Sequence, residues 1–347
     1  MQQDSSVLNT LRAAAILLVV ANHIAETRSP IHPFDYHLGR LGVLLFFVHT
    51  SCVLMMSLER TQLEGLRRAW HFYVRRVFRI YPLSILTVLL VVAFGVPPRA
   101  WDPALPDPSF RSVVANVLLV QDLAEVESVT APLWSLPLEL QMYLLLPAVF
   151  VFIRKGASLG RAAVIWVAGL ALAVTMPRWP ALSQFVPCFL SGVVTYCLAR
   201  RVAPRLPFWT WPIALTGLIA AYVGMAALSG TVHPAPVAWV ICLAAGVLLP
   251  MFRETAAPAR AVPAWIAKYS YGIYLSHMVT LYISFRVLSG APWVLQWVAF
   301  LGLTTGISVI SFHLVESPLI RLGARVANRL TMAPVVTGAT AASPSSS

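Results

Sequence analysis

The sequence has 347 residues, of which 59% are hydrophobic and 11% are charged, and its formal net charge is +12. A soluble domain has roughly 45–50% apolar and about 25% charged residues, so this composition excludes an ordinary soluble protein. The apolar residues gather in long runs separated by short polar stretches, and a helix needs about 20 residues to cross the hydrocarbon layer. The sequence therefore predicts an all-α, polytopic membrane protein.

Ten apolar runs are predicted to span the membrane. They are 7–25, 38–58, 80–96, 133–153, 162–177, 181–199, 208–228, 235–252, 268–288 and 293–315. The apolar stretch within 111–123 is too short to span, and we expect a short helix lying at the outer face there. Residues 331–347 are mostly small and polar, which predicts a disordered C-terminal tail after a membrane domain over 1–330.

The positive charge lies between the apolar runs. The basic segments contain Arg60, Arg67, Arg68, Arg75, Arg76 and Arg79, then Arg154, Lys155 and Arg161, then Arg200, Arg201 and Arg205, then Arg253, Arg260 and Lys268, and last Arg321, Arg325 and Arg329. Lys and Arg gather in cytoplasmic loops, so ten crossings with both termini cytoplasmic place all of these segments inside a plasma or inner membrane. A nucleic-acid site would instead form one basic patch interleaved with stacking aromatics, so no nucleic-acid partner is expected.

Several common sites lack their residues in this sequence. All four cysteines lie inside apolar runs and form no CxxC pair, so we expect neither a disulfide nor a metal site. A Walker loop, a GxSxG elbow, an HExxH helix and a Rossmann fingerprint are absent, which argues against a nucleotide-driven pump, a serine hydrolase and a zinc protease. The first run carries Arg12 and is followed by no clear cleavage site, so a retained helix is expected rather than a signal peptide.

Two ionisable residues share the first predicted span. An ionisable residue inside the bilayer costs about 2.5–3.5 kcal/mol on insertion scales, so each one needs an explanation. His23 follows Arg12 by eleven residues, which places the two within about 20° on a helix and about 16 Å apart along its axis. We expect both to face one side, with Arg12 nearer the cytoplasm. The alternative is that Arg12 snorkels to the inner surface and His23 only caps the outer end.

Three further ionisable residues lie in or beside later spans. Glu139 lies in LWSLPLELQMYLLLP, and its partner must come from another helix, for instance as a structural pair with an arginine of 75–79. His277 lies in the middle of its span, where a bond to a neighbouring helix and a catalytic role are both open. Glu316 follows the last span, and a contact with the inner arginines is expected for it.

The segment HFYVRRVFRIYP contains a dense basic cluster. Arg75, Arg76 and Arg79 fall within about one helical turn at the predicted cytoplasmic surface, beside Tyr81 and the aromatics at 72–73. Guanidinium groups so placed can bind phosphate, and the aromatic rings could stack an adenine. Anchoring of the inner helix end is the alternative.

Six segments resemble membrane acyltransferase family 3, the O-acyltransferases that modify bacterial surface polysaccharides, nodulation factors and some antibiotics. In LNTLRAAAILLVVANH, Arg12 and His23 reproduce the family's spacing of arginine, ten residues and histidine. The other segments are GVLLFFVHTS at 42–51, FYVRRVFRIYP at 72–82, PLWSLPLELQMYLLLP at 132–147, KYSYGIYLSH at 268–277 and VESP at 315–318. The resemblance extends over about residues 9–318.

The chain departs from the family at a few positions of these segments. It has Asn9, Thr10 and Ala13 where aspartate and glycine are usual, Leu44 where an acidic residue is common, and Thr50 and Ser51 in place of a Ser-Gly pair. These departures bear on the acceptor pocket more than on the fold or the reaction class.

The resemblance implies an integral membrane enzyme that transfers an acyl group, most simply acetyl, from cytoplasmic acyl-CoA. The acceptor is a hydroxyl of a carbohydrate, such as a cell-surface polysaccharide, or of a glycosylated small molecule, and no permanently bound cofactor is expected. The arginines of 75–79 and Tyr81 would bind the donor, its arm would pass Arg12, and His23 would act as general base. Glu139 would orient His23 or the acceptor hydroxyl.

Two other classes remain open from the sequence. A transporter of a sugar or lipid-linked intermediate would also have ten helices with few buried charges, although no paired half-repeats are evident. A non-catalytic sensor or scaffold would be expected to carry a sizeable soluble domain.

Overall fold

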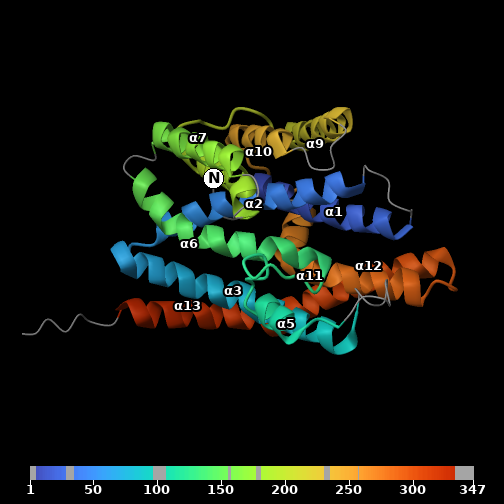
Figure 1. Cartoon of the computed structure of the whole chain (residues 1–347). Coiled ribbons are helices and arrows are strands. Elements are labelled where there is room, and N and C mark those ends of the chain that lie inside the picture. The colour runs from blue at the N-terminus through green and yellow to red at the C-terminus, as the bar shows by residue number, and fades with distance from the viewer. Residues whose placement is uncertain are drawn as a thin grey trace, which may run out of the picture.

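The computed structural model describes residues 5–28, 35–96, 107–154, 158–176, 181–229, 235–256 and 258–332. Within these ranges the chain is helical, joined by turns and one isolated bridge between Leu206 and Phe252 (Figure 1). The helices and helical turns are α1 (Ser6–Arg28), α2 (Asp35–Arg60), α3 (Gly65–Phe94), α5 (Phe110–Val117), η1 (Ala131–Trp134), α6 (Ser135–Ile153), α7 (Leu159–Thr175), η2 (Ala181–Phe185), α8 (Val186–Leu198), α9 (Thr210–Ser229), α10 (Ala235–Leu248), η3 (Leu249–Met251), α11 (Ala261–Tyr282), η4 (Ile283–Val287), α12 (Trp293–Ser311), η5 (Phe312–Glu316) and α13 (Ser317–Met332). The predicted all-α class is confirmed.

The apolar runs form long helices. Six helices of the described residues are long and apolar enough to cross a membrane, and three apolar helices are shorter. The six are 6–27, 38–60, 65–94, 131–153, 210–229 and 293–330, and the three are 159–175, 182–198 and 235–251. The remaining predicted span, 268–288, falls on α11 and the π-helical turn η4. The chain is therefore a multi-pass membrane protein, while the count of ten crossings and the cytoplasmic termini stay predictions.

Three boundaries differ from the prediction. The third helix begins at Gly65 rather than at 80, so the basic cluster and the apolar span form one helix, which ends where Gly95 adopts a left-handed conformation with φ of 64°. The helix expected over 111–123 is shorter: α5 begins after Ser109, whose side chain accepts a hydrogen bond from the Ser112 backbone, and it ends at Val117. The tail was predicted to begin at 331, but α13 continues to Met332, and the rest of the predicted tail lies outside the described residues.

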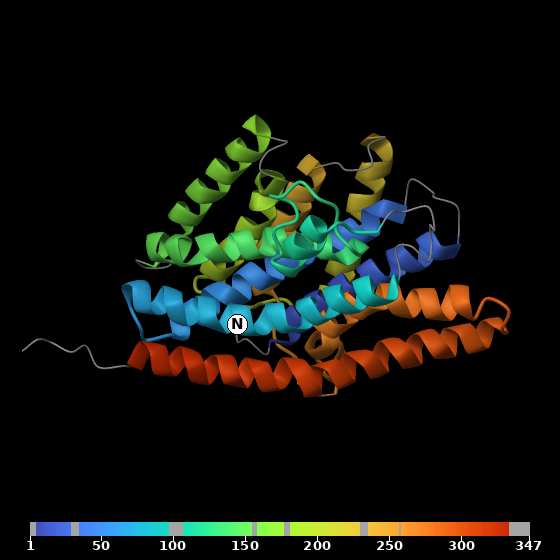
Figure 2. The same ribbon diagram turned by 60° about the horizontal axis from the view of Figure 1, so that its bottom comes forward.

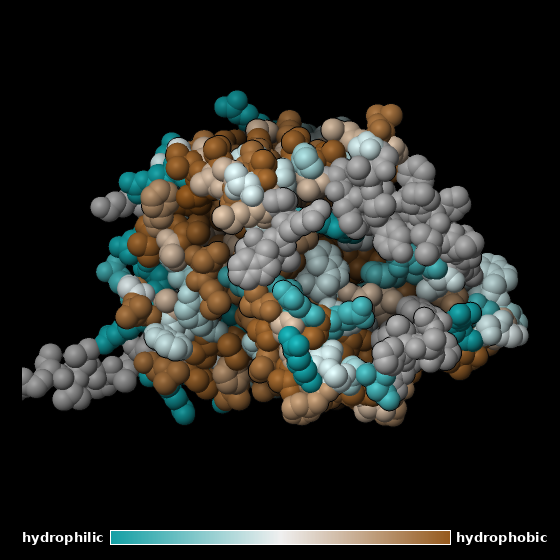
Figure 3. All heavy atoms as spheres, in the orientation of Figure 1, coloured by the Kyte–Doolittle hydropathy of each residue, from teal (hydrophilic) through white to brown (hydrophobic). Residues whose placement is uncertain are grey.

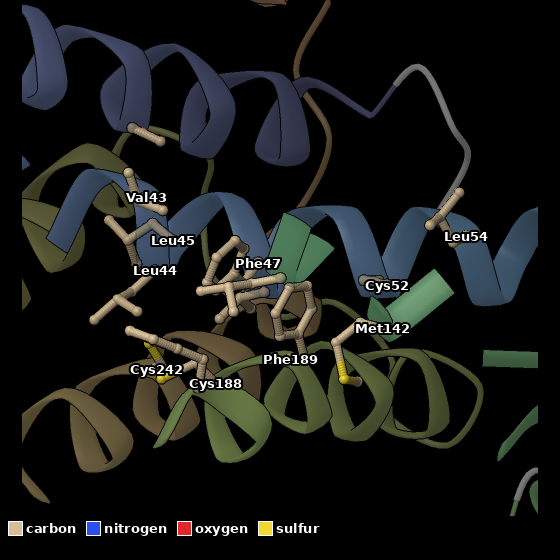
Figure 4. Packing of buried hydrophobic residues seen from close by; sticks show 14 of the residues in the cluster. Val43, Leu44, Leu45, Phe47, Cys52, Leu54, Met142, Cys188, Phe189 and Cys242 are labelled. Atoms are coloured by element: carbon tan, nitrogen blue, oxygen red, sulfur yellow. The ribbon is translucent and has the colours of Figure 1, made fainter. Parts of the chain in front are cut away.

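The central helices are α1, α2, α8 and α11. α1 packs against α2 and α11, and α2 packs against α8, which also contacts α7 and α10. The ring of Phe47 in α2 stacks on that of Phe189 in α8, with centroids 4.0 Å apart (Figure 4). Gly192 permits this approach, because a Cβ there would lie 2.1 Å from the Val48 carbonyl oxygen. Small residues at such crossings are usual for helix packing in membranes.

The outer helices carry apolar side chains on their exposed faces. In α3, α6 and α12, exposed residues include Leu90, Leu144 and Leu301. Hydrophobic side chains cover much of the face seen in Figure 3 outside the grey segments. Contiguous apolar surface of this kind is rare on soluble monomers and fits contact with lipid. Figure 2 shows α12 and α13 running along one side of the bundle as a nearly continuous rod.

Candidate active site

Arg12 and His23 of α1 both face α11. Arg12 donates a hydrogen bond from Nε to the Ser270 hydroxyl at 2.7 Å, and Nε2 of His277 lies 3.3 Å from Nδ1 of His23. Ser270 and His277 are seven residues apart, which is about two helical turns, so they lie on one face of α11. The predicted common face of Arg12 and His23 is confirmed.

Around Arg12 lies a cavity of about 110 Å³, which we call the arginine cavity. Its walls come from α1, α2, α3, α6 and α11. Its ionisable lining residues are Arg12, His49, Arg76, Arg79, Glu139, Tyr143, Tyr271 and Tyr274. Three guanidinium groups thus share this cavity with a single carboxylate, and such an excess of positive charge favours an anionic ligand.

The charges of this cavity are only partly paired. Arg79 forms an ion pair with Glu316, which is buried in the π-helical turn η5. The contact expected between Glu316 and the inner arginines is therefore confirmed. Glu139 accepts a hydrogen bond from Tyr143, one turn along α6, so this partner comes from its own helix and not from another helix as expected. Nε of Arg76 is buried without a partner among the described residues. A buried N–H without an acceptor costs free energy, so a ligand that accepts a hydrogen bond from Arg76 Nε would remove that cost.

Around His23 lies a second cavity of about 390 Å³, which we call the histidine cavity. This volume lies within the range of about 300–1,000 Å³ that is usual for small-molecule sites. Its lining residues are Val19, Asn22, His23, Glu26, Gly39, Arg40, Val43, Ala131, Pro132, Trp134, Phe185 and Tyr274. Polar groups and the aromatic rings of Trp134, Phe185 and Tyr274 therefore share one site, a mixture suited to a hydroxyl-bearing ring.

The hydrogen bonds of His23 define which ring nitrogen is basic. Nδ1 of His23 lies 2.9 Å from the Val19 carbonyl oxygen, and Nδ1 of His277 lies 3.1 Å from that of Ile273. A carbonyl oxygen only accepts, so both neutral rings carry their proton on Nδ1. His277 Nε2 can then act as a second, longer acceptor of the same His23 Nδ1–H, which is shared with the Val19 carbonyl oxygen. The lone pair of His23 Nε2 is left free of these bonds, as a general base requires.

A carboxylate stands beside this free nitrogen. Glu26 Oε2 lies 4.0 Å from His23 Nε2, on the next turn of α1. The Asn22 side chain fixes the arrangement: it donates to Glu26 Oε1 at 2.6 Å and accepts from the Gly39 backbone at 3.0 Å. When His23 takes up a proton, a carboxylate at this place stabilises the imidazolium.

The two cavities share part of one wall. Val43 of α2 and Tyr274 of α11 line both of them. The Tyr274 hydroxyl donates to the Pro132 carbonyl oxygen at 2.6 Å and accepts from the Ser135 hydroxyl at 2.7 Å. The arginine cavity and the histidine cavity therefore meet at Val43 and Tyr274, and α1 contributes Arg12 to the first and His23 to the second.

Some predicted site residues lie elsewhere. Arg75 does not line the arginine cavity; it lines a small neighbouring pocket together with Arg76. Tyr81 donates from its hydroxyl to the Leu118 carbonyl oxygen at 3.0 Å, and so contacts the end of α5. Glu139 and His23 line different cavities, so the structure does not bring them together as an orienting pair.

Sequence reasoning missed three polar residues of the site. Glu26 and Asn22 were detectable as neighbours of His23 on α1, because residues three and four apart share a helix face. His49 is 5% exposed and lines the arginine cavity, and its Nδ1 has no partner among the described residues. In the sequence, His49 could have been noticed as a histidine within the apolar run that forms α2. The described residues show no group of three or more His, Cys, Asp or Glu placed to hold a metal ion.

Comparison with known proteins identifies several relatives. The chain is 26% identical to acyltransferase MdmB of Streptomyces mycarofaciens over 325 positions, covering 82% of this chain and 80% of the relative. It is 25% identical to nodulation protein 10 of Rhizobium leguminosarum bv. viciae, with 90% of each chain covered. It is 24% identical to peptidoglycan O-acetyltransferase OatA of Listeria monocytogenes, where 91% of this chain matches 56% of the relative. The chain thus spans little more than half the length of that last protein.

No solved structure matches the chain. Residues 6–313 match the family described as acyltransferase domain. All residues that line the two cavities fall within this range, whereas Glu316, the ion-pair partner of Arg79, lies just beyond it. The resemblance expected from the six sequence segments is therefore confirmed. The chain belongs to this family of membrane acyltransferases.

Proposed function

We propose that the protein is an integral membrane O-acyltransferase that moves an acyl group, most simply acetyl, from cytoplasmic acyl-CoA to a hydroxyl of a sugar-containing acceptor. The observation that carries this proposal is the pairing of two adjoining cavities, one rich in arginine and one holding a histidine whose Nε2 takes no part in the hydrogen bonds to Val19 and His277. A relative named as a peptidoglycan O-acetyltransferase supports acetyl as the acyl group and a glycan as the acceptor.

The arginine cavity is proposed to hold the donor end. Acyl-CoA is a polyanion, and Arg12, Arg79 and Arg76, whose Nε has no hydrogen-bond partner among the described residues, offer charge-assisted hydrogen bonds to it. With ten crossings and cytoplasmic termini, the Arg12 end of α1 faces the cytoplasm of a plasma or inner membrane, where acyl-CoA is found. Glu139 lines this same cavity, so we assign it to the donor side together with Tyr143.

The histidine cavity is proposed to hold the acceptor. His23 Nε2 removes the proton from the acceptor hydroxyl as its oxygen attacks the thioester carbonyl carbon. The new C–O bond replaces the C–S bond, and the leaving thiolate takes the proton from the imidazolium, so the products are an ester and free CoA. Glu26 stabilises the imidazolium during the step. General-base action of this kind contributes about 10²–10⁴-fold in rate.

A transfer assay with radiolabelled acetyl-CoA tests the proposal. Membranes expressing the wild type, His23→Ala or His313→Ala are incubated with the donor, and extracted glycan and lipid fractions are counted separately. His313 lies on the exposed side of η5 and serves as the histidine control. We expect label in one acceptor fraction for the wild type and His313→Ala, and a loss of at least about 100-fold for His23→Ala.

The same assay can refute the proposal. Equal counts in all three membranes and in empty membranes would contradict acetyl transfer from acetyl-CoA and favour a different donor or a transporter. Normal transfer by a folded His23→Ala protein would contradict the role of His23. Label on the wild-type protein without acceptor would indicate a covalent acyl-imidazole at His23 instead of direct attack.

A further inference from the structure

The shared wall of the two cavities has a consequence for the choice of acyl group. This step rests on the proposed function, because the acyl carbon held in the arginine cavity must meet an oxygen or nitrogen in the histidine cavity. The residues that line both cavities are Val43 and Tyr274. We propose that Val43 and Tyr274 form a constriction that admits acetyl and excludes long acyl chains, which makes them the residues that set acyl-chain specificity.

Tyr274 is fixed from several sides. Its hydroxyl is bound to Pro132 and Ser135, and the side chain is 6% exposed. Its ring contacts the ring of Phe46 at 6.3 Å and that of His277 at 6.1 Å between centroids. A side chain held by two hydrogen bonds and two ring contacts cannot swing aside without losing them, so it forms a firm edge of the passage.

Val43 is fixed through the crossing of α1 and α2. The side chain is 4% exposed, and the preceding residue, Gly42, packs so tightly that a Cβ there would lie 2.5 Å from the Ala15 carbonyl oxygen. The backbone that carries Val43 therefore has little freedom to move away from α1. A branched side chain at this place also has few rotamers.

The sizes of the two cavities agree with a short acyl group. The arginine cavity, at about 110 Å³, is well below the range of about 300–1,000 Å³ usual for small-molecule sites, so it has little room for a folded alkyl chain. A long chain would have to enter the histidine cavity ahead of its carbonyl carbon, and there it would compete with the acceptor. An acetyl group needs to bring only one methyl group past Val43 and Tyr274.

The chemistry at the constriction is the same for every chain length. The C–S bond of the thioester breaks, a C–O bond to the acceptor forms, and one proton passes from the acceptor hydroxyl through His23 to the thiolate. Discrimination therefore has to arise from whether the carbonyl carbon can reach the acceptor, and a single methylene in a tight pocket changes rates by about 10–200-fold.

Competition between acetyl-CoA and hexanoyl-CoA tests this inference. The full-length protein in membranes is given each donor with the acceptor fraction identified by the transfer assay, and initial rates are compared. We expect the wild type to prefer acetyl at least about tenfold, and Val43→Ala to reduce this preference about tenfold. Val48→Ala is the matched control, because Val48 is a fully buried valine of the same helix that lines neither cavity.

Two further variants keep the test decisive if Val43→Ala does not fold. Val43→Leu narrows the passage and should lower propionyl transfer more than acetyl transfer. Tyr274→Phe keeps the ring but removes both hydroxyl bonds, and should relax the preference for acetyl.

The outcomes separate this inference from the proposed function. A wild type that uses hexanoyl-CoA as readily as acetyl-CoA would overturn the constriction while leaving the acyltransferase reaction intact. The constriction is also overturned if the folded Val43 and Tyr274 variants keep the wild-type preference, or if Val48→Ala changes it equally. Transfer from neither donor would instead contradict the proposed function itself.

Discussion

His277 of α11 lies against His23 of α1, with Nε2 of His277 3.3 Å from Nδ1 of His23 and the ring centroids 5.0 Å apart. His277 is fully buried, and its own Nδ1 is held by the Ile273 carbonyl oxygen. His277 can therefore accept a hydrogen bond and hold the ring of His23 in place, but it lines neither cavity. This geometry makes His277 a positioning residue.

We therefore predict that His277→Leu lowers kcat for acyl transfer without changing KM for the donor. The loss of one orienting hydrogen bond corresponds to about 0.5–1.5 kcal/mol, which is a fall of about 2- to 13-fold. His277→Gln, which keeps an acceptor in this region, should recover part of the rate. Steady-state kinetics on both variants measure this, and an equal change in donor KM would show that the effect reaches the arginine cavity instead.

Glu26 gives a second prediction on the acceptor side. Its carboxylate is 4.0 Å from His23 Nε2 and stabilises positive charge that forms there only during the reaction. Glu26→Gln keeps the size and can keep the bond from Asn22 but removes the charge, so we expect kcat to fall by about tenfold or more. Glu26→Asp should lose less.

The control for Glu26 is donor binding. Because Glu26 does not line the arginine cavity, protection of the protein by acetyl-CoA against thermal unfolding should be the same in Glu26→Gln and wild type. A rate unchanged in Glu26→Gln would remove Glu26 from the reaction.

The arginines of α3 should differ in their effect on the donor. Arg76 lines the arginine cavity and has a buried Nε without a partner among the described residues, whereas Arg75 lines only the small neighbouring pocket. Loss of a charge-assisted hydrogen bond costs about 1.5–3 kcal/mol, so Arg76→Gln should raise KM for acetyl-CoA by about 10- to 150-fold. Arg75→Gln should raise it much less. Equal effects of the two changes would show that phosphate contacts extend over both pockets.

Periodicity and spacing were enough to predict most of the helices and the shared face of Arg12 and His23, although α13 was not predicted. The extent of α3 was not predictable from hydropathy, since its first turns are polar and Pro82, a residue type that often kinks or ends a helix, lies inside it. The division into two cavities was not predictable either, because it depends on how α2 and α11 cross α1. Glu139 and His23 are both polar residues in apolar spans, and only the packing of α6 places Glu139 beside Arg76 and Arg79 rather than beside His23.

A buried imidazole illustrates the same limit. His49 stands out in the sequence as a polar residue in an apolar run, but its neighbours in the sequence do not reveal its surroundings. Only the crossing of α1, α2 and α3 shows that it shares a cavity with Arg12 and Arg76.

The stability of the bundle depends on the close crossing of α2 and α8. A Cβ at Gly192 would lie 2.1 Å from both the Ser51 hydroxyl and the Val48 carbonyl oxygen. Backbone at that distance has to move, so we predict that Gly192→Ala lowers the free energy of unfolding by about 1–3 kcal/mol, as overpacked cores do.

The matched control is Gly302→Ala in α12, where a Cβ would meet nothing within 4 Å. This change should be neutral or stabilise the helix by up to about 1 kcal/mol, because alanine is the better helix former. Thermal unfolding of both variants in detergent measures the difference. A loss of stability in Gly302→Ala equal to that in Gly192→Ala would show that alanine is harmful in these helices for another reason, and that the approach of α2 and α8 is not the cause.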